Sequence, residues 1–125
     1  LNTMLLANNN PKLIPLWGKM LKDVKFSKDK TSAWTILTQK DLTDFNIKIE
    51  SPAEFSNFFS KISIMDITIV FFETGSSQTK VSLRSRKSDV NKLANKFGGG
   101  GHKNAAGILI DKPLNDAIHD VTQCL

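Results

Sequence analysis

The sequence Gly98-Gly99-Gly100-Gly101-His102-Lys103-Asn104-Ala105-Ala106-Gly107 is the most informative stretch of this chain. Glycine has no Cβ atom, so its backbone can adopt positive φ angles and come close to a ligand. Successive exposed N–H groups in such a run can form an anion-binding nest, and His102, Lys103 and Asn104 add side-chain donors. The small residues at 105–107 allow close packing where the chain enters a predicted strand. We therefore predict a ligand-binding loop here.

The residues before the glycine run predict a helix. Ser88 is its expected cap and Asp89 lies at its positive end, before the apolar stripe Val90, Leu93, Ala94 and Phe97. Gly98 is the residue expected to end it. The order is thus helix, loop, strand, whereas a Walker loop or a dinucleotide-binding fingerprint requires strand, loop, helix. A bound phosphate would depend on loop amides, on Lys103 and on neighbouring arginines, because the helix presents its negative end.

Two other interpretations of the glycine run stay open. Most glycine-rich runs are flexible linkers. A folded turn without a ligand is the second alternative, although four glycines carry an entropic cost that a simple turn does not require. The capped helix before the run and the short apolar strand after it favour the ligand loop.

The remaining sequence predicts an α/β (α+β) fold. Apolar spacing predicts a helix over 11–24 and another from Pro113 to Val121. Cap signals predict two more helices, one with Thr38 as its N-cap and one with Ser51 as its N-cap, Pro52 at N1 and Glu54 at N3. Strands are predicted at 31–37, 64–72, 79–86 and 105–110, with a hairpin-like loop at 73–78. This order indicates a single compact domain with a mixed β-sheet flanked by helices. Residues 1–10 are typical of a linker.

The basic charge of the chain is concentrated in one segment. The whole chain has a formal net charge of +5, yet residues 78–103 contain seven basic residues and one acidic residue. The remaining residues contain ten basic and eleven acidic groups. A partner or substrate that carries phosphate is therefore the first expectation.

Within this segment, alternation along the predicted strand places Ser82, Arg84 and Arg86 on one face and Val81 and Leu83 on the other. Arginine suits phosphate because its planar guanidinium binds two oxygens at once. The alternative is that these residues form the solvated face of an edge strand.

Several classes of protein are excluded or disfavoured by what the 125 residues contain. No apolar run approaches the roughly 20 residues of a membrane-spanning helix. One cysteine, Cys124, cannot form an internal disulfide, and this favours a reducing compartment. The acidic residues are dispersed and the two histidines lie near no carboxylate motif, so we assign no catalytic residue and no metal ligand. The residues alone indicate a phosphate-binding domain without its own catalytic machinery.

The strand Lys80-Val81-Ser82-Leu83-Arg84-Ser85-Arg86, the Asp89-Val90-Asn91 triplet and the segment 97–107 resemble the DHH-associated domain of DHH-family phosphoesterases. The similarity is greatest to the bacterial branch of oligoribonucleases (nanoRNases) and 3′-phosphoadenosine-5′-phosphate phosphatases, which includes exopolyphosphatase-related proteins. The resemblance is tight over residues 79–110 and looser from about residue 31 onward.

The resemblance implies a division of labour between two domains of one polypeptide. An N-terminal DHH domain would hold Mn²⁺ (or Mg²⁺), and this chain contains no Asp-His-His triplet. Residues 1–24 would then be linker and helix from that absent catalytic domain, and residues 25–125 the DHH-associated, substrate-binding domain. The implied substrate-binding residues are Ser82, Arg84, Arg86, Gly99, Gly100, Gly101, His102, Lys103 and Asn104.

The expected function is to hold nucleotide phosphates for hydrolysis of short oligoribonucleotides, of 3′-phosphoadenosine 5′-phosphate, or of both. We expect the chain to be inactive alone, to need no cofactor of its own, and to belong to a cytoplasmic protein without membrane contact. The resemblance leaves a dimeric full-length protein open. The alternatives are a general module that binds single-stranded nucleic acid and one half of a cyclic-dinucleotide phosphodiesterase.

Overall fold

The computed structural model describes residues 10–125. The first half of the described chain contains α2 (Leu13–Lys22), β1 (Lys25–Phe26), β2 (Ser32–Leu37), α3 (Gln39–Phe45) and α4 (Ala53–Ile62). The second half contains β3 (Ile67–Gly75), β4 (Gln78–Ser85), α5 (Val90–Asn95), β5 (Gly100–His102), β6 (Ala105–Ile110) and α6 (Leu114–Thr122). The mixed α/β fold predicted from the sequence is confirmed.

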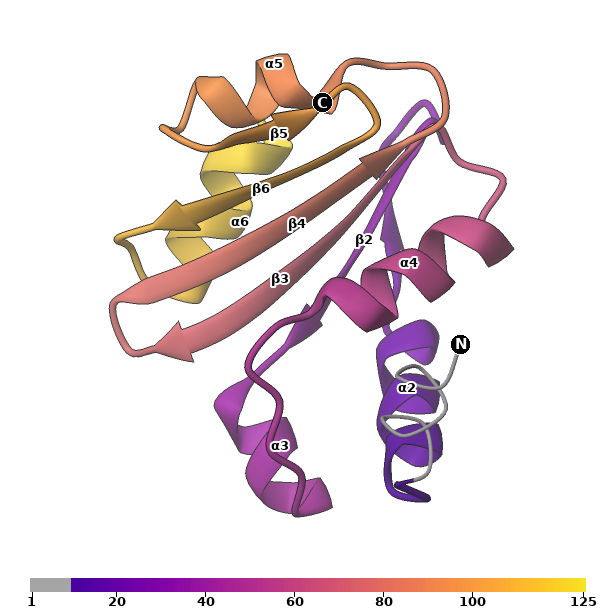
Figure 1. The fold of residues 1–125 in the computed structure, drawn as a ribbon, viewed down its shortest axis with the longest axis vertical. Helices are drawn as coiled ribbons and strands as arrows, with labels where there is room; N and C mark the ends of the chain where they lie inside the picture. Colours follow the sequence, from indigo (N-terminus) through magenta and orange to yellow (C-terminus); the bar gives the residue numbers. More distant parts are fainter. Residues whose placement is uncertain (1–9) are drawn as a thin grey trace.

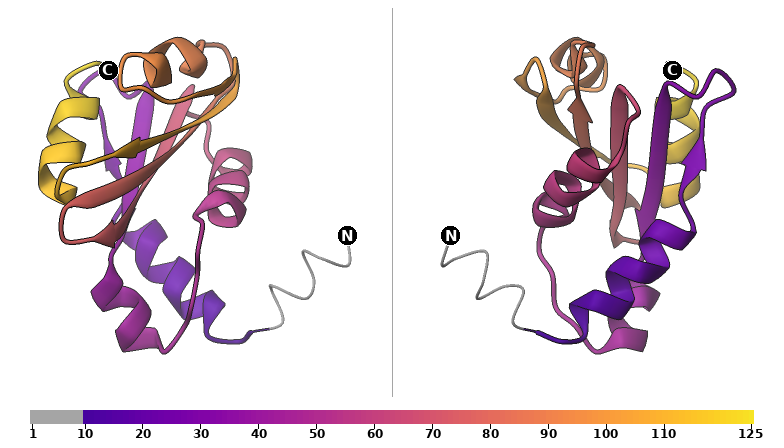
Figure 2. Two further views of the ribbon diagram at one scale, coloured as in Figure 1. Left: turned by 60° about the vertical axis from the view of Figure 1, so that its left-hand side comes forward. Right: turned by 90° about the vertical axis from the view of Figure 1, so that its right-hand side faces the viewer.

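The strands form one six-stranded sheet in the order β1-β2-β3-β4-β6-β5. Strands β2 and β3 are parallel, joined by the crossover that contains α3 and α4, and every other neighbouring pair is antiparallel. Helices cover both faces of the sheet, with α5 and α6 on one side and α2, α3 and α4 on the other (Figures 1 and 2).

Strand alternation divides the core into two layers. Ile69, Phe71, Val81 and Leu83 are fully buried under α5 and α6. On the opposite face, residues of β2 and β3 pack against α2, α3 and α4, where the buried side chains include Leu16, Met20, Phe55, Phe59 and Phe72. Strand β3 contributes to both layers because successive side chains point to opposite faces.

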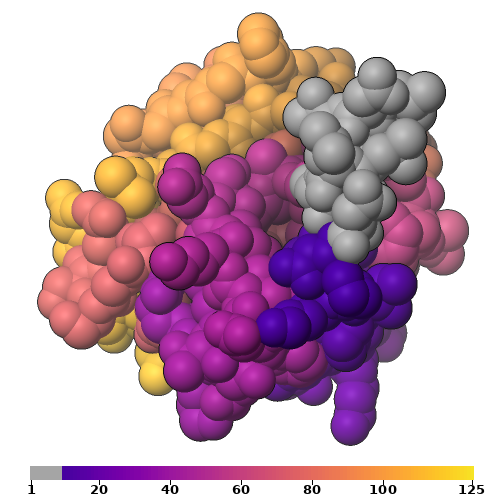
Figure 3. All heavy atoms as spheres, turned by 60° about the horizontal axis from the view of Figure 1, so that its bottom comes forward, coloured from indigo at the N-terminus to yellow at the C-terminus, as the bar shows by residue number. Residues whose placement is uncertain are grey.

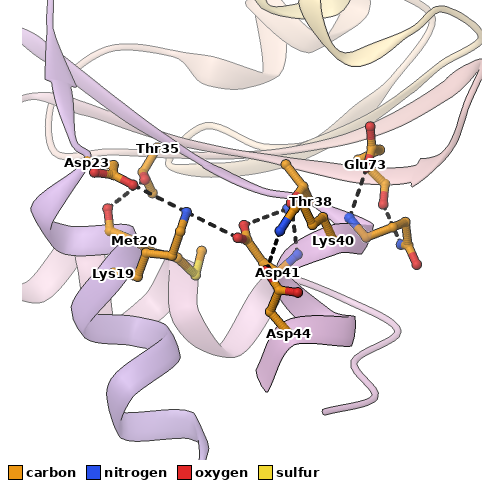
Figure 4. A network of polar contacts seen from close by, with 10 residues as sticks. Lys19, Met20, Asp23, Thr35, Thr38, Lys40, Asp41, Asp44 and Glu73 are labelled. Carbon is orange, nitrogen blue, oxygen red and sulfur yellow. Dashed lines mark hydrogen bonds and ion pairs between the residues drawn. The ribbon is translucent and has the colours of Figure 1, made fainter. Parts of the chain in front are cut away.

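A polar network fastens the helices below the sheet to one another (Figure 4). The Thr35 hydroxyl donates to the Met20 carbonyl at 2.6 Å, and Lys19 Nζ lies 3.1 Å from the carboxylate of Asp41. Thr38 and Asp41 also form a reciprocal capping box that starts α3. Burial acts to raise the pKa of Asp41, but hydrogen bonds from Thr38 and Lys19 outweigh it and leave that pKa lowered. In the space-filling view, the indigo atoms of the N-terminal described segment lie against the purple atoms of the segment that follows β2 (Figure 3).

The predicted order of helices and strands is confirmed, but several local predictions are wrong. The β3–β4 hairpin turns only at Ser76-Ser77, so most of the predicted loop at 73–78 is strand. Asp89 rather than Ser88 caps α5, because its carboxylate accepts from the Lys92 amide while the Ser88 hydroxyl is bonded elsewhere. Likewise Pro52 rather than Ser51 is the N-cap of α4.

Two strands were not predicted, namely β1 and β5. Strand β5 comprises Gly100 to His102 and pairs antiparallel with β6, so the second half of the glycine run is an edge strand and the residues that follow it form a hairpin turn. The first half ends α5: Gly98 has φ of 80°, and the amides of Gly98 and Gly99 donate to the carbonyls of Asn95 and Ala94. This is a Schellman ending, as expected for Gly98.

The predicted linker at residues 1–10 lies outside the described residues except for Asn10, which is exposed and begins the turn into α2. Among the described residues no helix has the length and apolarity that a membrane crossing requires. The division at residue 24 stays a prediction, although α2 packs into the same core as the sheet.

Candidate anion-binding groove

Strand β4 presents Lys80, Ser82 and Arg84 on the face of the sheet opposite α5 and α6, because Val81 and Leu83 point into the core between them. On the next strand, β6, the small residues Gly107 and Ala105 pair with Ser82 and Arg84, and Leu109 pairs with Lys80. Beside the side chains of Ser82 and Arg84, the surface of β6 therefore consists mostly of backbone, which we call the floor.

This arrangement leaves a hollow of about 330 Å³ between the start of α4, strand β4 and the β5–β6 hairpin. We call it the first hollow. Its lining residues are Ser51, Pro52, Ala53, Lys80, Val81, Ser82, Arg84, Gly100, Gly101, Ala105, Ala106 and Gly107. Four of the nine predicted site residues, Ser82, Arg84, Gly100 and Gly101, are brought together here.

Arg84 is the charged centre of the hollow. Its guanidinium donates to Asn57 Oδ1 at 3.1 Å, to Ser82 Oγ at 3.1 Å and to the carbonyl of Leu83 at 3.0 Å. Burial lowers the pKa of Arg84. Among residues 10–125, no carboxylate lies within ion-pair distance of this guanidinium. A half-buried arginine held only by neutral acceptors retains an unneutralised positive charge that a ligand anion can meet.

The glycines are explained mainly by packing. A Cβ atom at Gly99 would lie 2.2 Å from the Gly107 carbonyl oxygen, and one at Gly101 would lie 2.6 Å from the Ala105 carbonyl oxygen. The Gly101 amide donates to Asn91 Oδ1 at 3.0 Å. Since the amides of Gly98, Gly99 and Gly101 already have acceptors within the protein, the run does not form the predicted anion-binding nest.

The tip of the β5–β6 hairpin carries three more of the predicted residues, all exposed. His102 is the last residue of β5 and pairs with Ala105, and Lys103 begins the turn. The side chains of both make no hydrogen bond within residues 10–125. Asn104 differs, since its amide donates to Ser85 Oγ at 3.2 Å and to the Arg86 carbonyl at 3.4 Å. Asn104 thus anchors the tip to the segment that follows β4.

Arg86 lies apart from the first hollow. Its guanidinium donates to the carbonyls of Ser60 and Ser63 at the C-terminal end of α4, where a cation also favours the helix dipole. Its backbone amide and those of Lys87 and Ser88 donate to one oxygen of Asp66. The strand alternation that grouped Arg86 with Arg84 ends at Ser85, where β4 ends.

Some residues of the groove were not predicted. Lys80 was counted in the basic segment but not assigned to the site, although it shares the strand face of Ser82 and Arg84. Asn57, which orients Arg84, lies on α4, and nothing in its local sequence signals this contact. Asn91, which accepts from the Gly101 amide, belongs to the Asp89-Val90-Asn91 triplet of the resemblance but was not assigned to the site. Within the described part of the chain, no three His, Cys, Asp or Glu residues cluster as metal ligands would.

This chain belongs to the DHHA1 domain family, whose pattern matches residues 44–125. It is also similar to curated proteins of known name. The bifunctional oligoribonuclease and PAP phosphatase NrnA of Mycoplasma genitalium is 36% identical over 66 residues, which cover 51% of this chain and 21% of that protein. The probable bifunctional oligoribonuclease and PAP phosphatase NrnA of Streptococcus mutans is 28% identical over 96 residues, which cover 77% of this chain and 31% of that protein.

Among solved structures, an exopolyphosphatase-related protein from Bacteroides fragilis superposes with a TM-score of 0.79 at 28% identity. The match covers 91% of this chain and 34% of that one. A pGpG-specific phosphodiesterase, PggH from Vibrio cholerae, superposes with a TM-score of 0.59 at 15% identity and so shares the fold. The chain spans about a fifth to a third of the length of the curated relatives it matches.

Proposed function

We propose that this chain is the substrate-binding part of a DHH-type phosphoesterase and holds nucleotide phosphates in the first hollow. The observation that carries the proposal is Arg84, a half-buried cation without an acidic partner among the described residues, beside Lys80 and above a floor of glycine and alanine backbone. The family assignment and the NrnA relatives support short oligoribonucleotides and 3′-phosphoadenosine 5′-phosphate as the substrates.

Chemistry would come from a second domain of the same polypeptide. The side chains of residues 10–125 do not supply a metal-ligand cluster, so Mn²⁺ or Mg²⁺ would be held by the N-terminal DHH domain. The role of this chain is to bind and orient the phosphates so that the scissile bond reaches that metal centre. His102 and Lys103, exposed at the hairpin tip, would close on the ligand from the side opposite α4.

Binding of adenosine 5′-monophosphate to the 125-residue chain tests the role of Arg84. Replacing Arg84 with Gln removes a charge-assisted contact worth about 1.5–3 kcal/mol, so titration calorimetry should show an affinity at least about tenfold weaker. Lys22→Gln removes a charge from an exposed position outside the hollow and should leave the affinity unchanged. Equal affinities of wild type and Arg84→Gln would contradict the proposal.

The role of His102 is tested separately, because its exposure means that His102→Ala should not alter the fold. Attached to a DHH domain, the variant should hydrolyse 3′-phosphoadenosine 5′-phosphate at least tenfold more slowly if His102 donates to a substrate phosphate. The same assay with the 125-residue chain and Mn²⁺ should show no hydrolysis. Wild-type turnover by the variant would remove His102 from the site.

A general module for single-stranded nucleic acid is disfavoured by the lining of the first hollow. Such modules stack bases on aromatic side chains, and the residues that line this hollow include no aromatic one. RNA-binding affinity distinguishes the two functions. A general module binds internal segments of RNA as tightly as free ends, whereas a pocket for terminal phosphates binds only RNA that has a free end.

A further inference from the structure

The three nitrogens of the Arg84 guanidinium have different surroundings. Its Nε donates to Asn57 Oδ1 at 3.1 Å, and its Nη1 donates both to Ser82 Oγ at 3.1 Å and to the Leu83 carbonyl at 3.0 Å. Arginine carries one N–H on Nε and two on each Nη, so the hydrogens of Nε and Nη1 are all used. Nη2 has no acceptor within residues 10–125.

Nη2 is accessible from outside the protein. In the described part of the chain, Ser56 Oγ is the buried side-chain polar atom that lacks a hydrogen-bond partner. Nη2 also lacks a partner but is not such an atom, so solvent reaches it. Arg84 lines the first hollow and a second hollow of about 340 Å³, and both are parts of one groove that follows β4 between α4 and the β5–β6 hairpin (Figure 1). Arg84 therefore offers Nη2 to a ligand in this groove.

Asn57 is the partner of Arg84 that comes from another element. Ser82 and Leu83 lie on the same strand as Arg84, whereas Asn57 is an exposed residue of α4, on the other side of the groove. The single N–H of Nε lies in the plane of the guanidinium. Its bond to Asn57 therefore fixes how the group is rotated, and with it the direction of Nη2.

The side chain of Asn57 is neutral, so it holds Arg84 without cancelling the charge. Helix α4 carries charged residues one turn before and one turn after this position, Glu54 and Lys61, but meets Arg84 with an amide. An aspartate has nearly the same shape and would accept the same hydrogen bond. Its carboxylate would form an ion pair with the guanidinium, which would then attract a phosphate less strongly.

We propose that Asn57 is a positioning residue for anion binding, which directs Nη2 of Arg84 to a nucleotide phosphate and leaves the charge of Arg84 available to it. This inference rests on the proposed function. It adds that Asn57 acts through Arg84 and does not itself contact the ligand, and that a neutral acceptor is required at position 57.

The variant Asn57→Asp separates binding from folding. In titration calorimetry of the 125-residue chain with adenosine 5′-monophosphate, the affinity should fall at least about tenfold, because the charge of Arg84 is neutralised. The midpoint of urea unfolding should stay equal or rise, since the carboxylate accepts the same hydrogen bond and adds an ion pair. Asn115→Asp adds the same charge at an exposed position of α6 and should leave the affinity unchanged. A loss of stability together with affinity would indicate a merely structural role and overturn the inference.

The variant Asn57→Ala tests whether Asn57 acts through Arg84. Alone it should weaken binding of adenosine 5′-monophosphate by about three- to tenfold, because the guanidinium loses one fixed contact. In the Arg84→Gln background the same substitution should cause no further loss, since no guanidinium remains to be positioned. An equal loss in both backgrounds would show that Asn57 contacts the ligand directly, and the positioning role would be overturned.

Failure of the inference is distinguishable from failure of the proposed function. If the wild-type chain does not bind adenosine 5′-monophosphate, or if Arg84→Gln binds it as tightly as wild type, the proposed function fails and the inference fails with it. If Arg84→Gln weakens binding while Asn57→Asp and Asn57→Ala bind as tightly as wild type, the proposed function stands and only the role of Asn57 is overturned.

Discussion

Gly99 and Gly100 are neighbours in sequence with different structural requirements. A Cβ atom at Gly99 would meet the backbone of β6 at 2.2 Å, and a strand backbone cannot move away without breaking its pairing. A Cβ atom at Gly100 would lie 3.4 Å from Asn95 Oδ1 and 3.5 Å from Asn91 Oδ1, and both are ends of flexible side chains. At the scale of single residues, the fold therefore requires glycine at position 99, whereas Gly100 borders the first hollow and has room for a methyl group.

Stability measurements should separate these two glycines. Gly99→Ala should lower the free energy of unfolding by about 1–3 kcal/mol, because the added methyl overpacks the hairpin. Gly100→Ala should change it by less than about 0.5 kcal/mol, as expected where the new methyl fits. Urea denaturation of both variants measures the difference, and an equal loss at both positions would show that the hairpin tolerates no side chain anywhere in the run.

Between β4 and α5, the segment Ser85–Ser88 connects the two sides of the groove. Asp66 binds its amides, Arg86 binds the end of α4, and Asn104 ties the hairpin tip to it. Burial acts to raise the pKa of Asp66, but the hydrogen bonds from Ser88, Lys87 and Arg86 outweigh it and leave that pKa lowered. At the scale of elements, the Asp66 carboxylate holds the backbone of residues 86–88. This segment in turn contacts the end of α4 through Arg86 and the tip of the β5–β6 hairpin through Asn104.

Asp66 should contribute to stability in a pH-dependent way. Asp66→Ala leaves several amides without their acceptor and should lower the free energy of unfolding at pH 7 by about 1–3 kcal/mol. Because the pKa of Asp66 is lower in the folded state than in the unfolded state, its contribution is present above about pH 4 and is lost as the pH falls through the folded-state pKa. Denaturation of wild type and variant between pH 7 and pH 3 should show the difference shrinking, and a constant difference would contradict this origin.

The two cores on opposite faces of the sheet are joined through β3, which contributes side chains to both. Helix α2, within the predicted linker region 1–24, places Leu16 and Met20 in the core under β2 and β3, and α3 is fastened to it through Asp41. At the scale of the whole molecule, α2 is therefore expected to unfold together with the sheet rather than separately.

Two substitutions in α2 test this cooperativity. Leu16→Ala should lower the free energy of unfolding by about 2–5 kcal/mol and keep a single transition, because a fully buried side chain is lost from the shared core. Ile14→Ala on the same helix, where the side chain is 74% exposed, is the matched control and should change stability by less than about 0.5 kcal/mol. A small effect at Leu16 would place α2 outside the folding unit.

The limits of prediction follow from the range of the interactions. Apolar periodicity identified the helices and the longer strands, and alternation placed Ser82 and Arg84 on one face of β4, because both patterns arise within a few consecutive residues. Strand β1 was missed because two residues carry too little periodicity, and β5 because glycines have no pattern of side chains. The contacts of Asn57 and Asn91 were missed because they join residues 27 and 10 positions apart, beyond the few consecutive residues over which periodic patterns arise.

By itself, the sequence determined the α/β class, the order of the helices and longer strands, and the concentration of positive charge around β4 and the hairpin, since these depend on local composition and spacing. Only the tertiary structure decided that the glycine run is an edge strand held by packing, that Arg86 is directed to the end of α4, and that Arg84 lines two hollows. Those outcomes depend on which strands pair and where α4 lies on the sheet. Both are set by burial of distant apolar residues, which no local pattern records.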